Sequence, residues 1–207
     1  MRAGLSRQWL AGFAVGLSAV GAFWSFLATS HAQPAATLGP TYTADGRLEF
    51  PKPYRTWVFL SSGLDMSYLE NARAGQSTFG NVFVNPAAYD AFVRNGTWPD
   101  KTVLVLEVRS AEQSGSIIKG GRFQSEILRT EVHVKDTARF QGGWGFFGYS
   151  DETPAQMIPR SANCYSCHQD NGAVDTTFVQ FYPTLIPIAR AKQTFSRGYL
   201  ATEAARK

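Results

Sequence analysis

Five consecutive residues near the end of the chain combine side chains that can attach and ligate a prosthetic group. They read Cys164-Tyr165-Ser166-Cys167-His168, and the chain has no other cysteine. Two thiols separated by two residues can add to the two vinyl groups on one edge of a haem, and the histidine that follows can bind the iron. The motif therefore predicts one covalently attached haem c, with Cys164 and Cys167 as attachment points and His168 as proximal iron ligand.

Two other uses of these thiols are open, and the flanking sequence favours neither. A redox disulfide is expected in a βα unit with a cysteine at a helix start, which residues 160–163 do not indicate. A zinc site could recruit His133, but ligands at the adjacent positions 167 and 168 fit tetrahedral geometry poorly. Exported proteins usually pair cysteines from distant segments, and here no distant partner exists.

The N-terminus has the pattern of an export signal. Arg2 and Arg7 precede an uncharged apolar stretch over residues 9–27, and Ser30-His31-Ala32 provides small residues for a signal peptidase. A retained membrane anchor is the alternative, because the stretch approaches the length that spans a bilayer. We predict a signal peptide over residues 1–32, cleaved after Ala32, and a single periplasmic c-type haem domain over residues 33–207.

Charge and composition exclude some partners. The formal net charge is +4, to which Arg2 and Arg7 of the leader contribute two. No basic run remains in the mature chain, so nucleic-acid binding has no electrostatic support. No second long apolar segment exists, so no membrane association is expected after cleavage of the signal peptide.

The sequence that precedes the motif is mainly strand-like. Runs rich in aromatic and β-branched residues predict strands at 54–61, 80–85, 102–109, 126–135 and 144–149. Asn85, Pro86 and Gly96 have the cap, first-turn and stop positions of a short helix, with Tyr89, Phe92 and Val93 on its apolar face. Residues 176–193 are expected to be mostly helical. Short strands without long crossovers predict an α+β fold with a predominantly antiparallel sheet and a few flanking helices.

Segments along nearly the whole mature chain resemble the cytochrome P-460 and cytochrome c′-beta family. They are Pro53-Tyr54-Arg55-Thr56-Trp57-Val58, Val82-Phe83-Val84-Asn85-Pro86, Gly96-Thr97-Trp98-Pro99-Asp100, Val134-Lys135-Asp136, Arg139-Phe140, Trp144-Gly145-Phe146-Phe147 and Phe178-Val179-Gln180-Phe181-Tyr182-Pro183. The resemblance implies a homodimer and a five-coordinate haem with an open distal side. Members either oxidise hydroxylamine, with a lysine bonded to the haem, or bind nitric oxide or carbon monoxide without that bond.

The resemblance also assigns provisional roles to two residues. Leu106 stands where the enzymes carry the cross-linking lysine, so it is expected in an apolar distal wall with Leu104. Glu131 resembles the carboxylate of the family's pocket, and a carboxylate that loses hydration there can exchange protons with a bound ligand. The alternative is an exposed Glu131 paired with Lys135.

Three further residues are candidates for a sixth iron ligand. Met66 or Met157 would make the protein a six-coordinate electron carrier, although methionines more often fill gaps in cores. His133 alternates with Val132 and Val134, so it either faces the site or lies on the solvent face of a half-buried strand.

The sequence thus predicts a haem protein that binds a small diatomic or nitrogen-oxide ligand such as nitric oxide, with possible electron transfer to a redox partner protein. The alternatives are a hydroxylamine-oxidising or peroxidase-type enzyme and a plain electron carrier. Leu106 disfavours the enzyme.

Overall fold

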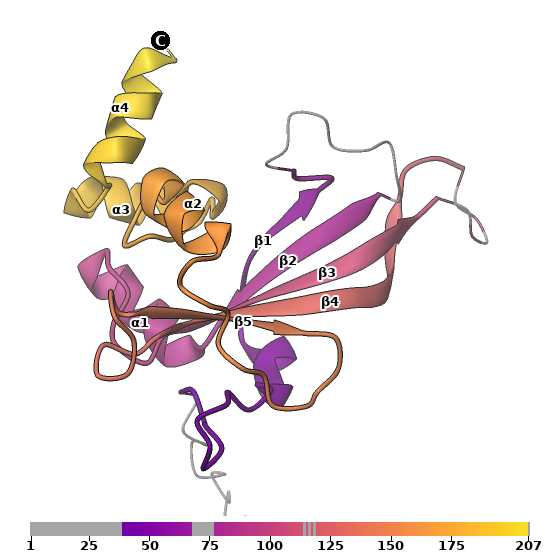
Figure 1. The fold of residues 1–207 in the computed structure, drawn as a ribbon. Coiled ribbons are helices and arrows are strands. Elements are labelled where there is room, and N and C mark those ends of the chain that lie inside the picture. The colour runs from indigo at the N-terminus through magenta and orange to yellow at the C-terminus, as the bar shows by residue number, and fades with distance from the viewer. Residues whose placement is uncertain (1–38, 68–76, 114, 116, 118, 207) are drawn as a thin grey trace, which may run out of the picture. The chain divides into compact units, whose positions relative to one another are not determined.

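The strands pair in chain order to form one antiparallel sheet (Figure 1). The computed structural model describes residues 39–67, 77–113, 115, 117 and 119–206. The strands are β1 (Val58–Leu64), β2 (Thr78–Val84), β3 (Val103–Glu112), β4 (Phe123–Lys135) and β5 (Trp144–Tyr149). The helices are η1 (Lys52–Thr56), α1 (Pro86–Asn95), α2 (Asn163–Asn171), η2 (Val179–Phe181), α3 (Ile186–Lys192) and α4 (Arg197–Ala205). The predicted α+β class is confirmed.

The predicted elements are correct in type more often than in their bounds. Strand β5 matches the prediction, and the other four strands differ from theirs at one or both ends. Tyr54 is not in a strand but in the 3-10 turn η1, which has a proline in its first positions. Residues 176–193 form only η2 and α3, because Pro183 and Pro187 restrict where a helix can continue.

Helix α1 has the predicted bounds, but Asn85 at its N-terminal end does not act as the predicted cap. Gly96 ends the helix with a φ of 77°, as its sequence position predicts. Asn85, however, makes no side-chain cap: its Oδ1 accepts a hydrogen bond from the Val103 backbone N–H at 2.8 Å. Phe92 is fully buried, whereas Val93 is 40% exposed, so the prediction that Val93 packs inward is wrong.

Both faces of the sheet are covered, each by its own cluster of buried side chains. On one face, α1, α2 and α3 pack Phe92, Tyr165 and Ala189 against strand residues that include Leu104 and Phe146. On the other face, the segment that contains Leu48, Tyr54 and Trp57 packs on Val103, Val105, Val132 and Val134. Period-two alternation along β3 and β4 therefore divides their residues between two interiors.

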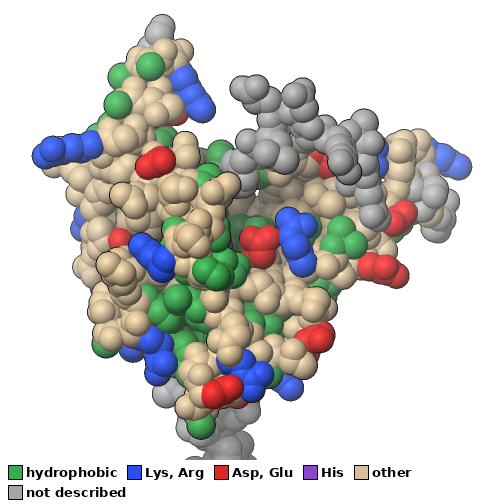
Figure 2. Space-filling view, viewed as in Figure 1, with side chains coloured by type: hydrophobic (Ala, Val, Ile, Leu, Met, Phe, Trp, Pro, Cys, Tyr) green, Lys and Arg blue, Asp and Glu red, His purple; other side chains and the backbone are tan. Residues whose placement is uncertain are grey.

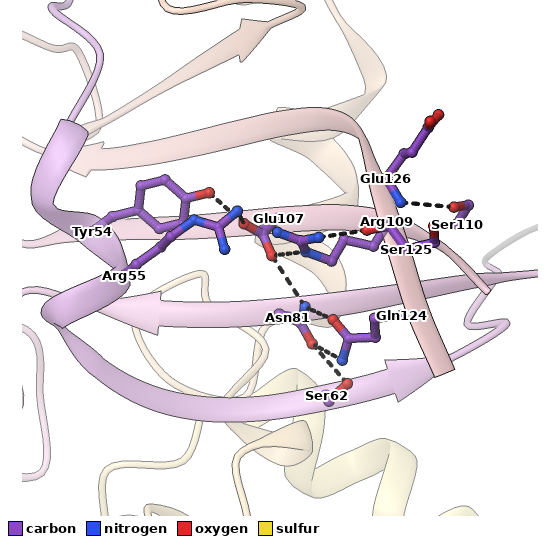
Figure 3. Close-up of polar contacts among 10 residues, drawn as sticks. All are labelled: Tyr54, Arg55, Ser62, Asn81, Glu107, Arg109, Ser110, Gln124, Ser125 and Glu126. Carbon is purple, nitrogen blue, oxygen red and sulfur yellow. Dashed lines mark hydrogen bonds and ion pairs between the residues drawn. The ribbon is translucent and has the colours of Figure 1, made fainter. Parts of the chain in front are cut away.

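The second face also buries a polar network centred on Glu107 (Figure 3). Its carboxylate, only 2% exposed, accepts hydrogen bonds from Tyr54 and Arg109 and forms an ion pair with Arg55 at 2.6 Å. Asn81 connects this group to Gln124 through an amide contact of 2.6 Å. The network rigidly joins η1, β2, β3 and β4 on the side of the sheet opposite Leu106.

Strands β3 and β4 pair regularly from Val103 to Val108, and the register then shifts on either side of Arg109. The shift marks a β-bulge, which increases the local twist of the hairpin. The regular part of the ladder is the part that lies next to the helices.

The predicted signal peptide falls outside the described residues. Among the residues that are described, no helix has the length and apolar character needed to span a bilayer.

Candidate functional site

The Cys-x-x-Cys-His motif lies on α2, where helical spacing brings its reactive side chains together. Cys164, Cys167 and His168 are separated by three and four residues and so share one face. Both cysteines are free and half-buried. Cys164 lies in the first turn of α2, so the interpretation that residues 160–163 do not indicate a cysteine at a helix start is wrong. The two thiols and the imidazole therefore face the same space.

The first of the two residues between the cysteines, Tyr165, fixes α2 against the sheet. Tyr165 is 7% exposed, and its ring packs edge-on against Phe146 of β5 at 4.5 Å between centroids. Its hydroxyl donates to the Ile158 carbonyl at 2.9 Å, and the Arg160 guanidinium lies over its ring. Tyr165 thus sets the distance between the motif and the strands.

A cavity of about 510 Å³ lies between the sheet and the helices. This volume is in the range of small-molecule and cofactor sites. Figure 2 shows apolar side chains gathered on this side of the molecule, with acidic and basic side chains next to them. The lining is mostly apolar and consists of Ser61, Gly63, Met66, Ser67, Thr78, Gly80, Val82, Leu104, Leu106, Val108, Arg129, Glu131, His133, Cys164, Cys167, His168, Phe178, Phe181 and Tyr182.

Successive cross-strand pairs of β3 and β4 form one wall of this cavity. Leu104 pairs with His133, Leu106 with Glu131, and Val108 with Arg129. All six side chains line the cavity, because residues two apart on a strand point to the same face. The wall therefore changes from aromatic and aliphatic beside α2 to charged farther along the strands.

His168 is held in a defined orientation. Its Nδ1 lies 2.8 Å from the Thr176 carbonyl oxygen. Because a carbonyl only accepts, Nδ1 carries the proton and Nε2 keeps its lone pair for a metal. Burial lowers the pKa of His168, although the Thr176 contact and the Glu131 charge oppose that shift. The imidazole is thus favoured in the neutral form that binds iron.

His133 lies against the motif rather than in solvent. Its ring is 4.6 Å from that of His168 and 4.3 Å from that of Phe146, both edge-on. Burial first, and the neighbouring His168 second, lower the pKa of His133 well below its usual value. The solvent-face alternative for His133 is therefore wrong.

Glu131 lines the cavity, but its partner differs from the one considered in the sequence. Arg129 donates to its carboxylate at 2.8 Å, whereas Lys135 pairs with Asp175. The side chain of Glu131 is 36% exposed, so the desolvation expected of an apolar wall is incomplete. Arg129 was not predicted, and its only signal in the sequence is its position two residues before Glu131.

Of the remaining candidates from the sequence, two line the cavity and one lies outside its lining. Leu106 lines the cavity with Leu104 and is half-buried. Met66 also lines the cavity, with its sulfur close to Gly63, where an added Cβ would lie only 2.1 Å from that sulfur. Met157 does not belong to the lining and forms an isolated bridge with Phe147.

These donors fit a haem better than a metal bound by protein ligands alone. Two thiols and one imidazole with a free Nε2 match the covalent and axial attachments of haem c, since the porphyrin supplies four further nitrogens. In the described part of the chain, no three His, Cys, Asp or Glu side chains gather as a metal site. The zinc hypothesis therefore gains no support.

Comparison with known proteins gives one family. No curated protein matches the chain. The description Cytochrome P460 matches residues 51–179, which include all five strands and the whole Cys-x-x-Cys-His motif. The match covers more than half of the chain and most of the residues that line the cavity, so this protein belongs to the cytochrome P460 family of haem-binding cytochromes.

Proposed function

We propose that this protein is an exported mono-haem c-type cytochrome whose open distal site binds a small ligand such as nitric oxide. The observation that carries the proposal is the convergence of Cys164, Cys167 and the free Nε2 of His168 on one largely apolar cavity. When bound there, haem supplies an iron with a one-electron couple and an axial position for a diatomic ligand.

Different residues of the chain would attach the haem, bind its iron and line the space for the ligand. Cys164 and Cys167 would hold it covalently, and His168 would bind it on one side. Leu106 and Val108 would give the other side an apolar surface, so that an uncharged ligand meets hydrocarbon there. The Glu131–Arg129 pair is the charged group of this wall and can donate or accept a hydrogen bond at its edge.

Location and partners are part of the same proposal. The predicted signal peptide supports export to the periplasm, where thiols can be attached to haem. Family resemblance supports a homodimer, and a one-electron couple supports a redox partner protein. Neither nucleic acid nor, after cleavage, a membrane is an expected partner.

A ferrous absorption spectrum and a carbon monoxide titration test the proposal. We expect a high-spin ferrous state that binds carbon monoxide readily at neutral pH, and a haem that remains on the polypeptide in a denaturing gel. Extraction of the pigment by acidified acetone would contradict covalent attachment. A far-red-shifted Soret band would instead indicate a cross-linked haem.

A six-coordinate electron carrier is the second candidate, because Met66 lines the cavity. That function predicts a low-spin ferrous spectrum that becomes high-spin in Met66→Ala. Met157→Ala is the matched control, since Met157 does not line the cavity. Hydroxylamine oxidation of the cross-linked type has less support, because the described residues of the lining include no lysine.

A further inference from the structure

The turn between α2 and η2 has an unfavourable backbone at two successive residues. Asp175 and Thr176 have φ values of 49° and 60°, in the left-handed region. A β-branched residue such as Thr176 rarely adopts this conformation. The turn also folds closely onto the end of α2, where a Cβ at position 172 would lie 2.6 Å from the His168 carbonyl oxygen and from Thr176. Strain of this kind persists only where the surroundings enforce it.

This strained turn presents one atom to the site. The Thr176 carbonyl accepts the Nδ1–H of His168 at 2.8 Å. A hydrogen bond from a ligating imidazole to a carbonyl fixes the orientation of the ring and raises its basicity. The conformation of Thr176 is thus coupled to the electronic properties of the proposed iron ligand.

Contacts on both sides of Thr176 hold the turn in place. Asp175 forms an ion pair with Lys135 of β4, whose ammonium also donates to the Trp98 carbonyl at 2.8 Å. The Lys135 and Asp175 side chains are 17% and 28% exposed. Thr177 accepts a hydrogen bond from the Trp98 indole N–H at 2.8 Å and donates to the Val174 carbonyl.

We infer that the Lys135–Asp175 ion pair is a positioning device for the proximal histidine. It holds Thr176 in its left-handed conformation, so that the carbonyl accepts the His168 proton and keeps the haem reduction potential low. The inference rests on the proposed haem site, and it adds to β4 a third residue on the site's face, after Glu131 and His133. Lys135 and Asp175 act through Thr176 and do not touch the haem.

The test compares haem-loaded wild type with Lys135→Met. Loss of the pair should release Thr176 and weaken the hydrogen bond from His168. The ferrous form should then become more stable relative to the ferric form, and the reduction potential should rise. One hydrogen bond predicts a change of about threefold to tenfold in that equilibrium, or about 30–60 mV for a one-electron couple. The iron–histidine stretching frequency, measured by resonance Raman spectroscopy, should fall in parallel. An unchanged potential and frequency would overturn the inference.

Further variants separate positioning from general stability. Lys135→Arg keeps a cation and should retain wild-type values, and Asp175→Asn removes the charge in a residue that tolerates the left-handed region. If Lys135→Met does not fold, Asp175→Asn should still raise the potential, and no rise there would overturn the inference. Lys52→Met removes an exposed pair with Glu152, 3.6 Å away, and is the control for a lost positive charge.

Thr176→Gly tests the role of strain directly. Glycine adopts positive φ without a steric penalty, so the carbonyl should keep its place without the ion pair. Lys135→Met combined with Thr176→Gly should therefore recover the wild-type potential, and failure to recover it would overturn the proposed route. If wild type itself carries no covalent haem, the proposed function fails first, which is a distinguishable result.

Discussion

Leu106 of β3 and Glu131 of β4 are directly paired across the two strands, and both side chains line the same cavity. Val82 of β2 pairs with Leu106 on its other edge, so Glu131 follows two aliphatic side chains in this cross-strand row. The cavity wall therefore meets a bound ligand with hydrocarbon beside one ion pair. Changes at positions 106 and 131 are expected to have different consequences.

We expect no lysine to be bonded to the haem of the wild-type protein. Leucine has no nucleophile, and the described lining contains no lysine. Mass spectrometry of the haem peptide should show only the segment from Cys164 to His168. Leu106→Lys places an amine in the wall and should shift the Soret band to the red, whereas Leu106→Met should not. A second peptide containing Lys101 or Lys119 in the wild type would contradict the prediction.

Cys164→Ser with Cys167→Ser should abolish haem staining on a denaturing gel, because the thiols are the attachment points. Each single variant should retain one thioether and a weaker stain. Ser166→Ala, between the cysteines but exposed, is the control that should stain like wild type. Full staining of the double serine variant would rule out attachment through these thiols.

Glu131→Gln should change the ligand-binding curve or the ferric spectrum, because it removes a charged carboxylate that lines the cavity. Arg129→Gln should change the same curve, because it removes the partner of that carboxylate. Glu203→Gln, which breaks an exposed pair on α4, should leave it unchanged. Superimposable curves for Glu131→Gln and wild type would place the carboxylate outside the ligand chemistry.

The buried Glu107 should give the protein acid-dependent stability. Burial opposes its ionisation, but hydrogen bonds from Arg109 and Tyr54 and the charges of Arg109 and Arg55 hold the pKa of Glu107 below its ordinary value of 4.5. The unfolded chain therefore takes up this proton first as the pH falls, and the stabilisation present above pH 4.5 is lost toward the lower folded value.

Glu107→Gln should lower the free energy of unfolding at pH 7 by about 3 kcal/mol, because it leaves two arginines without their carboxylate. Urea unfolding at about pH 7 and pH 3 should show this difference narrowing in acid. Tyr54→Phe removes one hydrogen bond and should cost about 1 kcal/mol. A difference for Glu107→Gln that is the same at both pH values would show that the carboxylate charge is not what stabilises the network.

The sheet was predictable because its strands are rich in aromatic and β-branched residues and its turns carry strong signals. β5 is directly preceded by Gly142 and Gly143, both with positive φ, and its bounds agree with the sequence prediction. The end of α1 follows from Gly96. The bounds of β1 did not follow, because Tyr54 has a strand-forming side chain but belongs to a turn that contains Pro53. Local propensity cannot reveal that its hydroxyl is fixed by Glu107, 53 positions away.

The site was predictable only as far as residues adjacent in sequence define it. Cys164, Cys167 and His168 are specified by one local motif. The alternation of side chains along β4 puts Glu131 and His133 on one face of the strand. Only the packing of α2 shows that this face lies toward the interior and not toward solvent. Lys135 and Asp175 are 40 residues apart, and no local pattern connects them. Thr176 acts through its backbone carbonyl, which side-chain identity does not report.

The β-bulge at Arg109 divides the β3–β4 hairpin into a part with regular pairing and a part with irregular pairing. Between Val103 and Val108 a shift of one position would exchange Glu131 and His133 for Val132 and Val134, turning valines toward the cavity and polar side chains into the opposite core. Beyond Arg109 the ladder is already irregular, so an insertion or deletion there need not shift the pairing between Val103 and Val108. A change in length at the far end of the hairpin is therefore expected to leave Glu131 and His133 facing the cavity.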